Sequence, residues 1–200
     1  MHVRWYPYAG DVIVVGLLAP PHSQAVGEIA RRAAAGGAKV QVVGLVPGDP
    51  AWDTELFQLA TAGVGHATVV RAARDAMEPA DLDLALRYLP DIRAVVLVGP
   101  PARLLPTAIP GADFAGAPLV IVGPLDDDAL AALESRRGSV DPEPAPGNAA
   151  AGPILLEPPA RDPDGTFAGF VAALAVRLDA GEPPDVAFRA TIALLAVDPA

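Results

Sequence analysis

GEIARRAAAGGAKVQVVG, residues 27–44, passes from a predicted helix through a pair of glycines into a predicted strand. Four apolar residues fall on one face of that helix: Val26, Ile29, Ala30 and Ala33. Gly36-Gly37 favours the end of the helix, and Lys39 to Val46 follows as the strand. The run Asp11-Val-Ile-Val-Val-Gly16 precedes the helix and is typical of a strand buried on both faces. The stretch therefore predicts a strand, a helix and a second strand in succession.

The same alternation continues along the chain. Further strands are predicted over four short apolar stretches: residues 66–71, 93–98, 118–122 and 154–156. Helices are predicted between and after them: one capped by Asp53, one with Pro79 in its first turn, one from Asp126–Asp128 to about Arg136, one over residues 166–178, and one from near Asp185 that turns Val186, Ala190 and Leu194 inward. This alternation predicts an α/β fold, a three-layer α/β/α sandwich with a mainly parallel sheet.

Composition limits the classes of protein that need to be considered. The 200 residues are most simply one domain, 1–200, with an irregular segment rich in proline, alanine and glycine at about 138–153. A net charge of −10 with a single lysine, Lys39, argues against nucleic-acid and membrane partners. The absence of cysteine excludes disulfides and thiolate metal sites. No stretch predicts a signal peptide or membrane span, so a cytoplasmic location is expected.

Several common catalytic motifs are missing from the sequence. It contains no phosphate loop of the form G-x-x-x-x-G-K-S/T, no G-x-S-x-G elbow and no G-x-G-x-x-G fingerprint. The histidines, His2, His22 and His66, are dispersed and do not predict a zinc site.

Five segments, taken in order, carry a family resemblance: DVIVVG (11–16), GEIARRAAAGGAKVQVVG (27–44), VGLVPGD (43–49), AGV (62–64) and DPDGTFAGFVAALAVRL (162–178). They resemble the ribokinase, or PfkB, family of carbohydrate kinases, whose signature helix usually has the form D-T-x-G-A-G-D-x-F-x-x-G-F. The resemblance implies a ribokinase-like core that uses ATP and Mg²⁺ to phosphorylate a sugar or nucleoside hydroxyl. The lid strands of the family have no counterpart between Gly48 and Asp81, so the chain is expected to be a shortened and divergent relative.

The family's catalytic segment is altered in this chain. The resemblance implies that an aspartate in G-A-G-D accepts the hydroxyl proton, while amides at the helix start receive phosphate charge. Aligned from Phe167 backwards, Gly165 takes the aspartate position, and Asp162, Pro163 and Asp164 take the positions before it. Asp164 is therefore a displaced candidate base, with Gly165, Thr166 and Phe167 as the anion hole. The alternative is that Asp162 or Asp164 caps the helix, and another binding role also stays open.

The substrate and metal sides are also depleted. Where the family carries an aspartate and a G-G-x-x-x-N segment, this chain has His22, Ser23 and Gln24, which can contact a small ligand, although Ser23 can equally be a helix cap. The family's N-x-x-E segment corresponds to Gly123–Asp126, so Asp126 and Asp127 are candidate Mg²⁺ ligands. The alternative is an ordinary acidic helix start.

Two classes of function follow. The first is a carbohydrate kinase-like protein whose phosphoryl transfer is weakened or lost. Its cofactors, ATP and Mg²⁺, are implied by the resemblance alone. The second is a noncatalytic protein that binds a nucleotide, a metabolite or another subunit. A small-molecule ligand and a homo-oligomer are compatible with both.

Overall fold

A computed structural model describes residues 11–16, 23–50, 52–72, 76–137 and 152–197. Its six strands form one sheet in the order β3-β2-β1-β4-β5-β6, and every neighbouring pair is parallel. The strands are β1 (Asp11–Gly16), β2 (Lys39–Val46), β3 (Gly65–Arg71), β4 (Ile92–Val98), β5 (Leu119–Val122) and β6 (Ile154–Leu156). The mainly parallel sheet that the sequence predicts is therefore confirmed.

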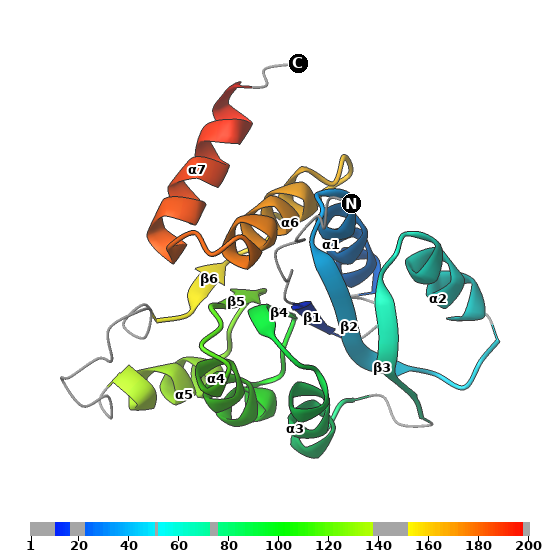
Figure 1. Cartoon of the computed structure of the whole chain (residues 1–200). Coiled ribbons are helices and arrows are strands. Elements are labelled where there is room, and N and C mark those ends of the chain that lie inside the picture. Colours follow the sequence, from blue (N-terminus) through cyan, green and yellow to red (C-terminus); the bar gives the residue numbers. More distant parts are fainter. Residues whose placement is uncertain (1–10, 17–22, 51, 73–75, 138–151, 198–200) are drawn as a thin grey trace, which may run out of the picture.

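Helices cover both faces of the sheet (Figure 1). They are α1 (Ser23–Ala35), α2 (Trp52–Thr61), α3 (Pro79–Tyr88), the short 3₁₀ turn η1 (Ala102–Leu104), α4 (Leu105–Phe114), α5 (Asp127–Arg137), α6 (Thr166–Asp179) and α7 (Pro184–Val197). Helices α1, α2, α6 and α7 lie on one face, and α3, α4 and α5 lie on the other. This arrangement is the predicted three-layer sandwich. None of the described helices is long and apolar enough to span a membrane.

Each face of the sheet has its own apolar core. In β1, Val12 and Val14 point into the core under α1 and α6, while Ile13 points into the core under α3 and α4. All three side chains are completely buried. Because helices cover both faces, the strands are continuous apolar runs instead of alternating apolar and polar residues.

The sequence pattern predicts no element over the stretch that forms α4. Pro106 lies in its first turn and Pro110 lies inside it, and proline in a helix interior removes a backbone hydrogen bond. Four residues of α4 nevertheless share a buried face: Leu105, Ala108, Ile109 and Ala112. Burial of this face therefore outweighs the cost of the internal proline.

Two predictions about helix residues are wrong. Asp53 does not cap α2, because it lies inside the first turn and pairs with Arg71. On α7, the predicted inward residues Val186 and Leu194 are exposed, and Ala187 and Thr191 are buried instead. The helix turns this other face towards α6 because Phe188 packs edge-on against Phe170, with ring centroids 5.8 Å apart.

The predicted irregular stretch at about 138–153 lies outside the described residues, apart from its last two positions. Between Gly48 and Asp81, the described residues contribute β3 to the single sheet and α2 to the helical layer over it. They form no separate lid sheet.

Candidate functional site

The order of the strands reverses beside β1, since β2 lies on one side of it and β4 on the other. In open parallel sheets, ligands bind at the carboxyl ends of the strands near such a reversal. At this edge, β4 and β5 are followed by Gly99 and Gly123, and a Cβ on Gly123 would lie 3.3 Å from the Cα of Gly99. The two backbones therefore approach closely at this edge, and a side chain at position 123 would crowd Gly99.

The start of α6 is shaped by Gly165. This residue has a φ of +67°, in the left-handed region that glycine adopts without strain. Its N–H donates to the carbonyl of Asp162 over 3.2 Å, which closes a tight turn before the first helical residue, Thr166. The turn folds Asp162 back towards the first amides of α6.

The carboxylate of Asp162 binds those amides directly. Its Oδ1 accepts a hydrogen bond from the N–H of Phe167 at 3.1 Å, and its Oδ2 accepts one from the N–H of Ala168 at 3.0 Å. A carboxylate at this position also interacts favourably with the helix dipole. Capping, which the sequence offers for either aspartate, is thus performed by Asp162. One of these two amides, that of Phe167, belongs to the anion hole that the family resemblance implies.

Asp164, the candidate base, is exposed to solvent. Its backbone carbonyl accepts a long hydrogen bond of 3.4 Å from Nη2 of Arg32. Its carboxylate makes no hydrogen bond or ion pair with the residues that the structure describes. The role of Asp164 as a base stays a prediction, as does an anion hole at Gly165, Thr166 and Phe167.

Arg32 of α1 lies across the start of α6. The sequence pattern does not predict this contact. A Cβ on Gly165 would lie 2.6 Å from Arg32 Nη2, and a Cβ on Gly169 would lie 3.2 Å from Arg32 Nη1. The two glycines therefore let the guanidinium pack against α6. The only local signal is the spacing of Glu28 and Arg32, four residues apart on one helix face.

Glu28 holds Arg32 in place from the other side. Arg32 Nε donates to Glu28 Oε1 over 2.6 Å, and Glu28 also pairs with Arg31, which in turn pairs with Glu55 of α2 at 2.9 Å. The hydrogen bond from Arg32 lowers the pKa of the Glu28 carboxyl, and Arg31 contributes to the decrease. The start of α6 is thus linked through charged side chains to α1 and α2.

The other predicted site residues are placed apart from this turn. His22 lies outside the described residues, Ser23 is the first residue of α1, and Gln24 is exposed beside it. Their contact with a ligand stays a prediction.

The candidate Mg²⁺ ligands lie at the start of α5, on the opposite face of the sheet from α6. Oδ1 of Asp126 accepts a hydrogen bond from the N–H of Ala129 at 2.8 Å, and Asp127 is exposed. Within the described ranges, no three acidic or histidine side chains come close enough together to hold a metal ion. The observed contact fits the alternative of an acidic helix start.

Comparisons with solved structures identify the fold class as ribokinase-like. A ribokinase II from E. coli aligns with 91% of this chain and 90% of its own, at a TM-score of 0.59 and 14% identity. A PfkB protein from Polaromonas sp. JS666 aligns over 92% and 93%, at a TM-score of 0.56 and 18% identity. A fructokinase from Xylella fastidiosa with bound ATP aligns with 94% of this chain and 86% of its own, at a TM-score of 0.59 and 14% identity. No family model and no curated protein matches the sequence.

These likenesses extend along nearly the whole of each chain and confirm the predicted ribokinase-like fold. The chain therefore has a ribokinase-like core fold, at 14 to 18% sequence identity to those three proteins.

Proposed function

We propose that this chain is a ribokinase-like protein in which ATP-dependent phosphoryl transfer to a sugar or nucleoside hydroxyl is weakened or lost. The observation that carries the proposal is the Asp162 carboxylate, which takes the N–H groups of Phe167 and Ala168. In the kinases that the chain resembles, amides at the start of this helix are expected to receive the phosphate charge that develops during transfer.

A phosphate oxygen and the Asp162 carboxylate repel one another at this position. Two like unit charges 4 Å apart repel by about 4 kcal/mol near a protein surface. The phosphate would also lose two of the three expected anion-hole donors, because the N–H of Phe167 binds the Asp162 carboxylate and the N–H of Gly165 binds the Asp162 carbonyl. Since one lost anion-hole donor commonly costs about 10²–10³-fold in rate, the occupied helix start by itself predicts slow turnover.

The position of the base supports the same conclusion. Gly165 stands where the family has its aspartate, and a side chain there would start 2.6 Å from the guanidinium of Arg32. General-base assistance typically contributes about 10²–10⁴-fold, and glycine cannot supply it. Asp164 is one residue away and exposed.

ATP is the phosphate donor to test because the fructokinase from Xylella fastidiosa binds it. The described residues do not fit an accompanying Mg²⁺ ion, since Asp126 binds the backbone of α5 and no metal-sized cluster of acidic side chains is present among them.

The proposal is tested by assaying the purified chain with Mg-ATP across pentoses, hexoses and nucleosides. We expect turnover near the background of ATP hydrolysis, and we expect Asp164→Asn to leave it unchanged. Asp126→Asn is the matched control at the other helix start. Robust phosphorylation that disappears in Asp164→Asn would overturn the proposal and establish the displaced aspartate as the base.

A further inference from the structure

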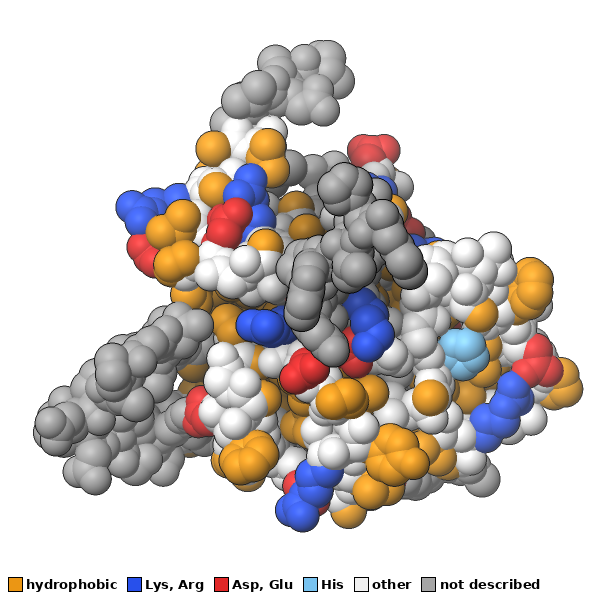
Figure 2. Space-filling view, in the orientation of Figure 1, with side chains coloured by type: hydrophobic (Ala, Val, Ile, Leu, Met, Phe, Trp, Pro, Cys, Tyr) orange, Lys and Arg blue, Asp and Glu red, His pale blue; other side chains and the backbone are white. Residues whose placement is uncertain are grey.

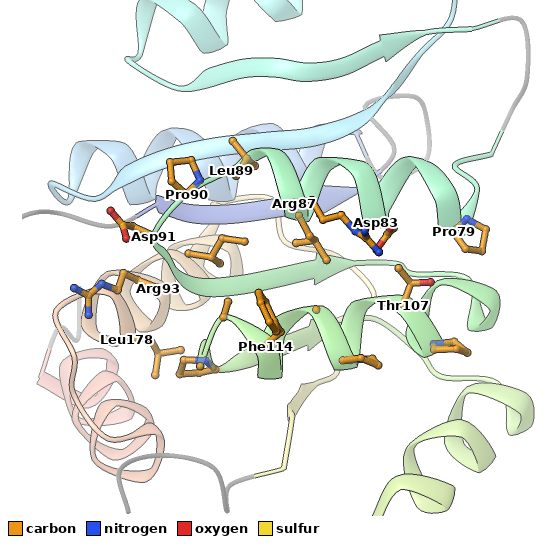
Figure 3. A pocket seen from close by; sticks show the side chains of 18 of the residues that line it. Pro79, Asp83, Arg87, Leu89, Pro90, Asp91, Arg93, Thr107, Phe114 and Leu178 are labelled. Atoms are coloured by element: carbon orange, nitrogen blue, oxygen red, sulfur yellow. Dashed lines mark hydrogen bonds and ion pairs between the residues drawn. The ribbon is translucent and has the colours of Figure 1, made fainter. Parts of the chain in front are cut away.

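A groove runs along α3 and α4, from Pro79 and Pro106 at the helix starts to Asp91 and Pro118 beside the starts of β4 and β5. It has a volume of about 1180 Å³. Figure 3 shows Asp83 and Arg87 on the α3 side, Thr107 and Phe114 on the α4 side, and Asp91 and Arg93 around the start of β4. The end of the groove that holds Phe114 lies beside the start of β5, at the opposite edge of the sheet from the end of β4, where the candidate site is sought.

The groove is lined in part by an aromatic side chain that is almost fully exposed. Phe114, the last residue of α4, is 98% exposed, more than any other large hydrophobic side chain among the described residues. Tyr88, at the end of α3, is exposed as well. In Figure 2, hydrophobic side chains reach the surface over α3 and α4, with charged groups beside them. Exposed apolar patches of this kind mark contact surfaces.

Phe114 and the groove lie on the same face, so the face has both a projecting ring and a cavity that can receive one. This is the geometric requirement of a two-fold symmetric contact, in which the same patch of each subunit meets itself. Aromatic residues that fill a partner's pocket commonly dominate the binding energy of such contacts. A standard interface of about 1,200–2,000 Å² would extend past the groove and also cover exposed parts of α3.

The charges that line the groove favour a second copy of this chain over a partner whose surface charges all have the same sign. Its lining has both signs, with three acidic residues, Asp83, Asp91 and Glu182, and two basic residues, Arg87 and Arg93. Asp83 and Arg87 lie one turn apart on α3 and pair over 3.0 Å, so two antiparallel copies of α3 can exchange these partners. The whole chain carries −10, which makes most of its surface repel a second copy.

We infer that the groove between α3 and α4 is the contact surface of a homodimer, in which Phe114 of each subunit enters the groove of the other. The contact is placed at Phe114, at the amino edge of the sheet, and it does not depend on whether the chain transfers phosphate.

The test is the molar mass of the full chain by size-exclusion chromatography with light scattering, over a series of protein concentrations. We expect twice the chain mass of 20.4 kDa for the native protein and a single chain mass for Phe114→Glu. The matched control is Phe57→Glu, because Phe57 is a 72% exposed phenylalanine on α2, away from the groove. Phe57→Glu is expected to remain dimeric, and circular dichroism verifies that both variants fold.

A native protein that stays monomeric at every concentration would overturn the inference, as would a Phe114→Glu variant that stays dimeric. A chain lacking residues 1–8 provides a further check. If only this shortened chain forms dimers, the aromatic N-terminal segment fills the groove in place of a second copy, and the inference is wrong.

Discussion

Asp162 and Asp164 are two residues apart, but only Asp162 binds the backbone of α6. Loss of an aspartate cap costs typically about 1 kcal/mol, whereas an exposed side chain without partners costs less than about 0.5 kcal/mol. We therefore expect Asp162→Ala to lower the free energy of unfolding by about 1 kcal/mol and Asp164→Ala to leave it nearly unchanged. Urea denaturation of both variants measures this difference, and a larger loss in Asp164→Ala would contradict the assignment of the cap.

Asp179, at the end of α6, is an acidic residue with a different environment. Its Oδ1 is buried and accepts no hydrogen bond from the described residues. Burial raises the pKa of the Asp179 carboxyl above its ordinary value of 3.8, with Arg93 opposing the increase and Asp11 adding to it. The folded state therefore binds the proton more readily than the unfolded state, and the ionised carboxylate destabilises the fold at neutral pH.

Asp179→Asn removes this ionised form, so the variant should melt at a higher temperature than the native protein at neutral pH. As the pH falls through the raised pKa of Asp179 towards 3.8, protonation of this carboxyl stabilises the native protein. The difference in melting temperature between the native protein and the variant should therefore shrink over that range. Thermal melts at a series of pH values test this, with Asp164→Asn as the exposed control. A variant that is less stable than the native protein at neutral pH would contradict the direction of the shift.

At the scale of the element, α6 packs both on the sheet and on α7. Phe170 is buried against the sheet and meets Phe188 of α7 edge-on, with an interplanar angle of 88°. We expect Phe170→Ala to cost about 3–5 kcal/mol of unfolding free energy. Chemical denaturation measures the loss, and Phe57→Ala on α2 is the exposed control. A loss similar to that of the control would show that the helix does not pack as described.

The contact between the two rings is tested separately. Edge-to-face aromatic pairs contribute about 0.5–1.5 kcal/mol beyond the area that they bury. A double-mutant cycle with Phe170→Leu and Phe188→Leu should give a coupling energy of this size. Additive effects of the two substitutions would mean that α7 does not dock on α6 through these rings.

Local patterns predicted those elements whose boundaries depend on local signals. Such patterns predict the strand from Asp11 to Gly16, the glycine stop after α1 and the helix that forms α6. The helix α4 was missed because its prolines conceal a regular buried face. The sequence of α7 is apolar nearly all round, so it does not indicate which face is buried. Only the packing against α6 buries Ala187 and Thr191 instead of Val186 and Leu194.

The candidate site was predictable only where its contacts are local. Asp162 lies within six residues of both amides that it binds, so a capping role could be proposed from the sequence. Arg32 reaches the carbonyl of Asp164 across 132 positions, and no spacing in the sequence indicates this contact. Tertiary proximity of this kind is known only once α1 and α6 are placed side by side.

At the scale of the whole molecule, the two edges of the sheet differ. The carboxyl edge has the close glycine backbones of β4 and β5, where related folds bind ligands. At the amino edge, the exposed Phe114 lies at one end of the groove between α3 and α4. The fold is ribokinase-like, while the start of α6, where we propose that a related kinase would receive phosphate, binds the chain's own Asp162 carboxylate.

The most direct test of this central claim is a titration of the ¹⁵N-labelled chain with Mg-ATP, followed at the backbone amides of Phe167 and Ala168 by NMR. Asp162→Gly, which frees both amides, is the comparison variant, and Asp164→Gly is its matched control. We predict that the two amides do not shift in the native chain or in Asp164→Gly, and that both shift in Asp162→Gly. Saturable shifts of Phe167 and Ala168 in the native chain would contradict the claim, because phosphate would then bind where Asp162 is held to exclude it.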